Sequence, residues 1–295
     1  MSRERWSTAI GLLVLISMVI AGCAAPTIPA TPPPAEGGPA VEGVTLPADA
    51  AADQTLHYVN EGGCGDGPFP GLDYGGPCTF GMMYLTGFLL DKDGNLLPGL
   101  FTDYVTEDNT VFQFHIDPRA VWSDGKPITA QDFVAWYNFI FDSKRANWPR
   151  TYVFGPVKGM DEFAAGETDT IAGFKAIDDK TLEITLKFAQ GWFPLRMAWV
   201  WSAPARVDQF TSIIEATDLA TPVDQRGAMG DLYFRGANAA DLIVSGPFRP
   251  TWLNPEPDAL YKYEQNPLWW GDKKPIITAL EGTTIRDFQT MLLMF

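Results

Sequence analysis

Histidine, cysteine and positive charge are scarce in this sequence. Its 295 residues include two His and three Cys, which is little material for a His/Cys metal centre or a Cys–His nucleophile pair. Lys and Arg number 21 against 36 Asp and Glu, a formal net charge of −15. Nucleic-acid binding needs clustered Lys and Arg to displace counterions, so we expect no nucleic-acid partner. No P-loop, nucleophile elbow or zinc-ligand spacing occurs, and we expect no cofactor, no metal and no catalytic residue.

Near the N-terminus, the apolar run Ala9–Ile20 is too short for a membrane span, which takes about 20 residues. It follows a short, positively charged start and ends in Ile20-Ala21-Gly22-Cys23, which resembles the bacterial lipobox. We predict a lipoprotein signal peptide over residues 1–22 and lipid attachment at Cys23, in preference to a plain signal peptide or an uncleaved anchor. Acyl chains on Cys23 would hold the mature protein to the outside of the cell membrane.

Proline and glycine are abundant in two segments. Residues 23–52 contain "PTIPATPPPAEGGPA" and cannot build a core, so we predict an extended tether there. The stretch "GGCGDGPFPGLDYGGPC" has no helical or strand period and predicts a loop. Cys23 is assigned to the lipid, so Cys64 and Cys78 remain as a pair. We predict a disulfide between them, worth about 3 kcal/mol in the chain-entropy model; two free thiols are the alternative.

Hydrophobic periodicity predicts the main elements. Residues 111–116 alternate strictly, with Phe112, Phe114 and Ile116 on one face, and Tyr104–Thr106 is expected to pair with them across a turn. Residues 82–90 form an apolar run that we interpret as helical. The other predicted strands are 55–60, 181–187, 259–266 and 276–285, and a helix is predicted to start within 286–295.

The most patterned stretch is "VWSDGKPITAQDFVAWY", residues 121–137. Residues 123–126 predict a tight turn in which Gly125 takes a positive φ. Thr129 is placed as a helix N-cap, and Asp132 three residues later completes a capping box. A catalytic Asp124 or Asp132 would lack a neighbouring His, carboxylate or metal set, so we expect structural roles for both. The predicted core stripe of the helix is Phe133, Trp136, Tyr137, Ile140 and Phe141.

Five blocks then occur in a familiar order, and they are "LLPGLFTDY", "TVFQFHIDPRAVWSDGKPITAQDFVAWY", "KAIDDKTLEITLK", "SGPF" and "YEQNPLWWGDKKPIITAL". From about Gln54 onward the chain therefore resembles the extracytoplasmic solute-binding proteins of ABC importers, in particular the peptide/nickel-binding family 5. It departs from that pattern at Asp117, Arg119 and Ala120, where the family has an Arg and a Gly.

The resemblance implies an α/β fold of the periplasmic-binding-protein-like type II, large two-lobe class. Because family members are about twice as long, we expect the chain to be truncated within the second lobe. The implied boundaries are 53–268 for lobe one, with a smaller subdomain at about 79–167, and 269–295 for the incomplete start of lobe two.

The resemblance also implies a function in binding and not in catalysis. It implies a lipoprotein that captures di- or oligopeptides outside the cytoplasmic membrane and delivers them to the permease and ATPase subunits of an ABC importer. An oligosaccharide- or nickel-binding member of the family and a secreted glycan hydrolase are the alternatives. "NEGG" at the end of the first strand is expected to face the ligand, although a plain strand-ending turn is the other interpretation. The predicted ligand-binding residues are Asn60, Glu61, Gly62 and Gly63, with Tyr84 and Trp201 as cleft aromatics.

Overall fold

A computed structural model describes residues 50–51, 53–60, 80–141, 153–210, 237–254, 260–285 and 287–293. Two predicted features, the signal peptide with Cys23 and the Cys64–Cys78 loop, lie outside these residues and stay predictions. None of the helices in the described ranges has the length and apolar character needed to cross a bilayer.

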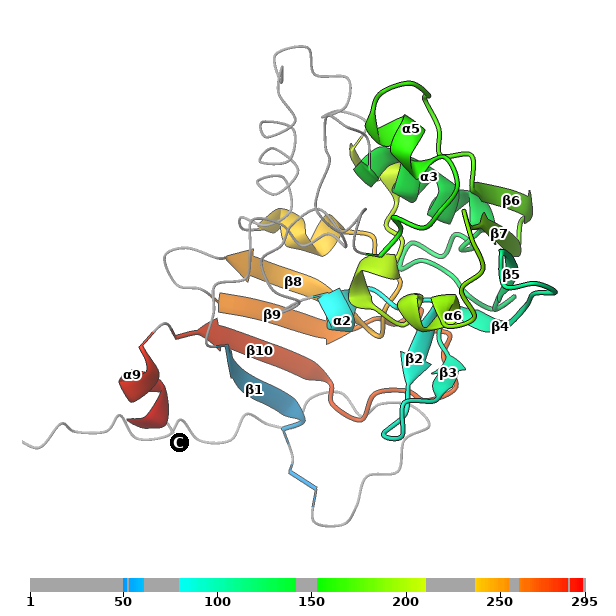
Figure 1. The fold of residues 1–295 in the computed structure, drawn as a ribbon. Coiled ribbons are helices and arrows are strands. Elements are labelled where there is room, and N and C mark those ends of the chain that lie inside the picture. Colours follow the sequence, from blue (N-terminus) through cyan, green and yellow to red (C-terminus); the bar gives the residue numbers. More distant parts are fainter. Residues whose placement is uncertain are drawn as a thin grey trace, which may run out of the picture. The chain divides into compact units, whose positions relative to one another are not determined.

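Sheet A has four strands in the order β1-β10-β9-β8 (Figure 1). Its strands are β1 (Thr55–Asn60), β8 (Phe248–Asn254), β9 (Leu260–Gln265) and β10 (Ala279–Thr284). The pair β1–β10 is parallel, whereas β10–β9 and β9–β8 are antiparallel. The predicted strands at 55–60, 259–266 and 276–285 are therefore confirmed.

Sheet C is antiparallel throughout and has the order β4-β5-β7-β6. Its strands are β4 (Phe101–Val105), β5 (Val111–Ile116), β6 (Phe174–Asp178) and β7 (Thr181–Thr185). Phe112, Phe114 and Ile116 are all buried, and Tyr104 pairs with Phe114, so the predicted alternation and hairpin are confirmed. These three side chains form the buried face of β5.

The predicted helix at residues 82–90 is wrong for most of its length. A short helix, α2 (Phe80–Met83), is followed by a two-stranded hairpin, sheet B, made of β2 (Phe88–Leu90) and β3 (Leu96–Pro98). The turn decides this outcome, because the Asp91 carboxylate accepts hydrogen bonds from the backbone N–H groups of Asp93 and Asn95, both at 2.8 Å. The apolar run therefore pairs across its polar turn instead of coiling.

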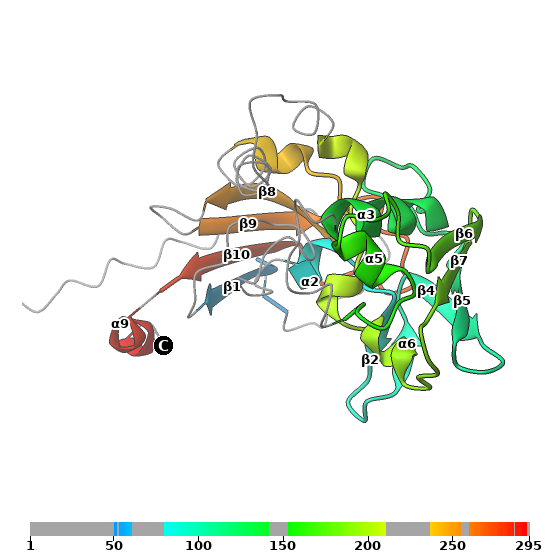
Figure 2. The same cartoon turned by 45° about the horizontal axis from the view of Figure 1, so that its top comes forward.

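Helix α3 (Ala130–Phe141) begins as the sequence predicts and packs against β6 and β7 (Figure 2). The backbone N–H of Thr129 donates to Asp132 Oδ2 at 2.8 Å, and the backbone N–H of Asp132 donates to Thr129 Oγ1 at 3.3 Å. All five residues of the predicted stripe are buried, so the capping box and the core face are confirmed. The remaining elements are α5 (Met160–Ala164), α6 (Phe193–Arg196), η1 (Val200–Ser202), η2 (Val207–Phe210), η3 (Ala237–Asp241) and α9 (Phe288–Leu293).

The predicted domain boundaries do not coincide with breaks in the sheets. Sheet C includes β6 and β7, which follow the predicted subdomain end at 167. Strand β10 falls within the predicted start of lobe two, 269–295, yet pairs with β1 and β9 of sheet A. The lobe boundaries themselves stay predictions.

Candidate functional site

The parallel pair β1–β10 places two distant segments at one end of sheet A. Strands β1 and β10 lie side by side (Figure 1). Asn60, the last residue of β1, is the register partner of Thr284, the last residue of β10. Carboxyl ends of parallel strands lie at the same edge of a sheet, and in open α/β sheets this edge is where ligands bind. We call these two strand ends the β1/β10 end; it is the candidate site.

Two residues before the strand ends, a tyrosine ring lies over a glycine. Tyr58 is the register partner of Gly282, and a Cβ built on Gly282 would come 2.5 Å from the Tyr58 hydroxyl oxygen and 2.7 Å from Tyr58 Cε2. Any side chain at residue 282 would displace the ring. The sequence-based reasoning missed this contact, although a glycine inside a strand pattern is a known signal for such close approach.

The two faces of sheet A differ in character at this point. The face that carries the Tyr58 ring also carries Tyr261, Tyr263 and Leu280, all buried. The opposite face carries charges. There, Glu281 lies 3.5 Å from His57 Nδ1 and 2.9 Å from Lys262 Nζ. Sheet A therefore has a buried, largely aromatic face and an opposite face that carries charges.

The predicted ligand-binding residues fall in different surroundings. Asn60 lies at the β1/β10 end, as described, whereas Glu61, Gly62 and Gly63 are outside the described residues. Tyr84 is 1% exposed and belongs to the hydrophobic core. Trp201 stacks on Trp199 with ring centroids 5.2 Å apart. The ligand contacts of all of these residues stay predictions.

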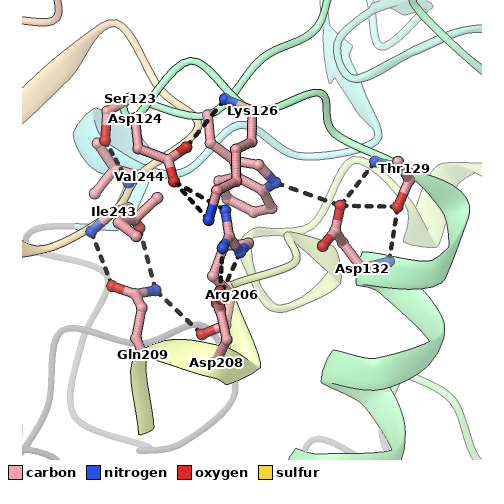
Figure 3. Close-up of polar contacts among 11 residues, drawn as sticks. Ser123, Asp124, Lys126, Thr129, Asp132, Arg206, Asp208, Gln209, Ile243 and Val244 are labelled. Carbon is pink, nitrogen blue, oxygen red and sulfur yellow. Dashed lines mark hydrogen bonds and ion pairs between the residues drawn. The ribbon is translucent and has the colours of Figure 1, made fainter.

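The patterned turn at residues 123–126 forms one side of a polar cluster that also includes Arg206, Asp208 and Gln209 (Figure 3). Ser123 exchanges two hydrogen bonds with Val244: its N–H donates to the Val244 carbonyl at 2.9 Å, and its hydroxyl accepts from the Val244 N–H at 3.0 Å. Asp124 accepts from the Lys126 N–H at 3.1 Å within the turn, and Gly125 has φ +85°. The predicted turn is confirmed, and it is tied to a segment far along the chain.

Arg206 lies between Asp124 and Asp208 in this cluster, and only 8% of its side chain is exposed. Its Nη1 donates to Asp124 Oδ2 at 3.2 Å, and its Nε donates to Asp208 Oδ1 at 2.8 Å. The hydrogen bond from Arg206 holds the pKa of the Asp208 carboxyl below its usual value. Gln209 closes the arrangement, because its side-chain oxygen accepts from the Ile243 N–H at 2.8 Å. The sequence-based reasoning missed Arg206, which no local pattern marks.

A groove of about 480 Å³ borders the cluster, lined by Lys126, Pro127, Thr129, Gln131, Asp132, Ala135, Arg206, Val207 and Asp208. The carboxylates on its wall are already engaged: Asp208 with Arg206, and Asp132 with the start of α3. The structural roles predicted for Asp124 and Asp132 are thus confirmed by their hydrogen bonds. Over the described part of the chain, no group of three His, Cys, Asp or Glu side chains is arranged to hold a metal ion.

Comparisons with known proteins show which family the chain resembles. The family described as "Bacterial extracellular solute-binding proteins, family 5 Middle" matches residues 95–295. The chain is 42% identical over 98 residues to the periplasmic oligopeptide-binding protein OppA of Escherichia coli, covering 32% of this chain and 18% of that protein. It is 27% identical over 190 residues to OppA of Salmonella typhimurium, covering 63% of this chain and 31% of that protein.

Among solved structures, Listeria monocytogenes OppA bound to peptide superposes with a TM-score of 0.67 and 20% identity, covering 83% of this chain and 45% of that chain. The structural likeness shows the shared type II, two-lobe binding-protein fold. The chain spans less than half the length of each of these three relatives. Because the family match covers more than half of the chain, this chain belongs to the bacterial extracellular solute-binding proteins of family 5.

Proposed function

We propose that this chain is part of a substrate-binding protein that captures di- or oligopeptides for an ABC importer. The observation that carries the proposal is the parallel β1/β10 end in a chain of family 5. Backbone groups where strands end can hydrogen-bond an extended peptide, whose main chain supplies regularly spaced donors and acceptors. The peptide-bound Listeria relative favours peptides over the oligosaccharide and nickel alternatives. A glycan hydrolase is disfavoured because the carboxylates of Asp124, Asp132 and Asp208 are already engaged in structural hydrogen bonds.

The proposed location is outside the cytoplasmic membrane, with Cys23 carrying the lipid. Tethering through residues 23–52 would raise the concentration of loaded protein near the permease. In bacteria that produce the protein, Cys23→Ala is expected to move it from the membrane fraction to the soluble fraction. Cys64→Ala is the matched control and is expected to leave it on the membrane. Equal fractionation of both variants and the unchanged protein would contradict the lipid anchor.

Peptide binding is tested by calorimetry with the full chain and alanine-based tri- to pentapeptides, with maltotriose and Ni²⁺ as competing ligand classes. We expect saturable binding of peptides only. Asn60→Ala is expected to weaken peptide binding about tenfold, corresponding to about 1.4 kcal/mol. The control is Thr55→Ala at the opposite end of β1, which is expected to leave the affinity unchanged. Binding of maltotriose or Ni²⁺ without peptide binding would overturn the proposal.

A further inference from the structure

We infer that the surface formed by Trp192, Leu195 and Trp199 rests on the lipid bilayer to which this protein is proposed to be anchored. The inference rests on the lipid anchor at Cys23, which is part of the proposed function, and adds the side of the molecule that faces the membrane. We call these three residues the tryptophan face. They are 51%, 45% and 41% exposed, so the face is open to its surroundings.

Helical turns hold the three residues on one side of the chain. Backbone hydrogen bonds of the i to i−3 type continue from Leu195, whose N–H donates to the Trp192 carbonyl at 3.1 Å, through Trp199. Spacings of three and four residues place all three on the same side of such turns. Phe193 and Met197, on the opposite side, are fully buried. The core therefore fixes the orientation in which the tryptophan face is presented.

The side chains of the tryptophan face suit the boundary between water and lipid. Tryptophan is enriched at that boundary because its ring is apolar and its indole N–H is polar. The Arg196 guanidinium lies 4.4 Å from the ring centroid of Trp192, so a cation accompanies the apolar surface. In this arrangement the rings and Leu195 can enter the headgroup region while the guanidinium stays among the lipid phosphates.

Charge favours a bilayer over a second copy of the chain as the partner of this face. The chain has 36 Asp and Glu, yet residues 184–207 contain none and include Lys187, Arg196 and Arg206. Lys187 and Arg206 form ion pairs, so Arg196 supplies the positive charge at the face itself. Anionic lipids attract Lys and Arg near the membrane surface. The net charge of −15 opposes both self-association and the approach of acidic surfaces to such lipids, which leaves the acid-free stretch as the side turned to the membrane.

The predicted tether brings the bilayer within reach. It runs from Cys23 to Ala50, the first described residue, and a chain of that length spans up to about 80 Å when extended. A tether this long lets any side of the folded part turn toward the membrane. Binding of the face is then intramolecular, so a weak affinity for lipid is enough to orient the protein.

The test uses the full chain, made in bacteria and reconstituted in vesicles of phosphatidylethanolamine and phosphatidylglycerol whose acyl chains carry bromine. Bromine quenches the fluorescence of tryptophans that enter the bilayer. Leu195→Glu is expected to lower the quenched fraction by at least about half, because a carboxylate opposes insertion beside anionic lipid. Leu268→Glu is the matched control, since Leu268 is also 45% exposed, and it is expected to leave the quenched fraction unchanged.

A second pair of variants locates the contact. Trp192→Phe keeps an apolar ring and is expected to remove part of the quenching, because its indole is among those that enter the lipid. Trp252→Phe, at a position of β8 that is 38% exposed, is expected to remove none. Thermal melting checks that each variant folds, and the Trp192→Phe result decides the test should Leu195→Glu not fold.

Each outcome decides the question. Equal quenching of Leu195→Glu, Leu268→Glu and the unchanged chain overturns the inference. A dimer in sedimentation that Leu195→Glu dissociates also overturns it, because a second copy then covers the face. Mass spectrometry of Cys23 separates this inference from the proposed anchor. A lipidated chain without quenching overturns the inference alone, whereas a chain without lipid contradicts the anchor, and the quenching difference at excess vesicles then still decides the inference.

Discussion

Sheet A and sheet C are built by opposite routes. Sheet C takes all four strands from one contiguous stretch, residues 101–185, and pairs them antiparallel. Sheet A joins β1, at residue 55, to β10, which ends at residue 284, and this joining pair is parallel. The hairpins β4–β5 and β6–β7 close short loops and β5–β7 spans residues 117–180, whereas the parallel pair β1–β10 spans residues 61–278 and therefore has the largest loop-closure cost. The candidate site lies on the sheet that needs the distant pairing.

The two sheets are also linked by contacts at residues where the chain departs from its family pattern. Arg119 donates to both carboxylate oxygens of Asp117, at 3.0 and 2.7 Å, and also to Asp272 in the loop between β9 and β10. Its guanidinium lies 5.9 Å from the ring centroid of Trp270. Asp117 and Arg119 thus form an ion pair at the exit of β5, and Arg119 connects it to the loop between β9 and β10.

The largest effect is expected in the core of sheet C. Phe114 stacks on Phe101 with ring centroids 5.0 Å apart, and it is fully buried. Phe114→Ala is expected to lower the free energy of unfolding by about 3–5 kcal/mol, because it removes a buried ring and leaves a cavity. Val105→Ala, at a position of sheet C that is 52% exposed, is the control and should cost less than about 1 kcal/mol. Denaturant titration measures both; similar costs would contradict the assigned core.

Arg206→Ala tests the polar cluster that lies outside both sheets. It leaves Asp124 and Asp208 without their shared cation, and we expect a loss of about 2–3 kcal/mol in the free energy of unfolding. Lys126 also lies 3.5 Å from Asp124, but its side chain is largely exposed, so Lys126→Ala should cost at most about 1 kcal/mol. If Lys126→Ala costs as much as Arg206→Ala, burial is not what makes the cluster stabilising.

Gly282→Ala tests whether sheet A can be destabilised without destabilising sheet C. The added Cβ forces the Tyr58 ring out of place, and overpacking of this kind costs about 1–3 kcal/mol. Hydrogen exchange is expected to accelerate at the amides of β1 and β10 and to stay unchanged at those of β5. Gly81→Ala, where no atom lies within 4 Å of the added Cβ, is the control. Equal acceleration in both sheets would show that they open as one unit.

The ion pair between Arg119 and Asp272, which links the two sheets, is expected to contribute less to the free energy of unfolding. In a double-mutant cycle, Arg119→Ala and Asp272→Asn are expected to show a coupling energy of about 0.2–1 kcal/mol, because both side chains are more than half exposed. The coupling is expected to fall at 1 M salt, since salt screens exposed pairs. Thermal unfolding of the four proteins measures it, and a coupling of zero at low salt would remove this contact from the link.

The smallest effect concerns pH. The pKa of Asp208 is lowered in the folded chain by the hydrogen bond from Arg206. Its contribution to stability is therefore complete above the ordinary carboxyl pKa of about 3.9 and is lost as the pH falls through the lower folded value. Asp208→Asn removes this titrating group. The free energy of unfolding of the variant should therefore fall less steeply than that of the unchanged protein between pH 5 and pH 2, the range in which a carboxyl with a lowered pKa takes up its proton. Parallel curves for both proteins would contradict the assignment.

The sequence by itself determined the elements whose signals are local. The alternation of residues 111–116, the capping box of Thr129 and Asp132, and the turn around Gly125 all follow from backbone preferences within a few residues. Asn60 was also placed at a strand end from sequence alone. The failed helix at 82–90 had a local reason too, since its apolar run has no decisive period and the Asp91 turn favoured pairing.

Only the tertiary structure decided how these elements meet. No local pattern states that β1 pairs with β10, that Tyr58 covers Gly282, or that Arg206 lies between Asp124 and Asp208. These contacts join residues far apart in the chain, and their energy depends on burial and on the partner brought alongside. The sequence alone predicts the end of β1, where we propose that a ligand binds. Which residues lie beside that end is decided by the pairing of β1 with the distant strand β10.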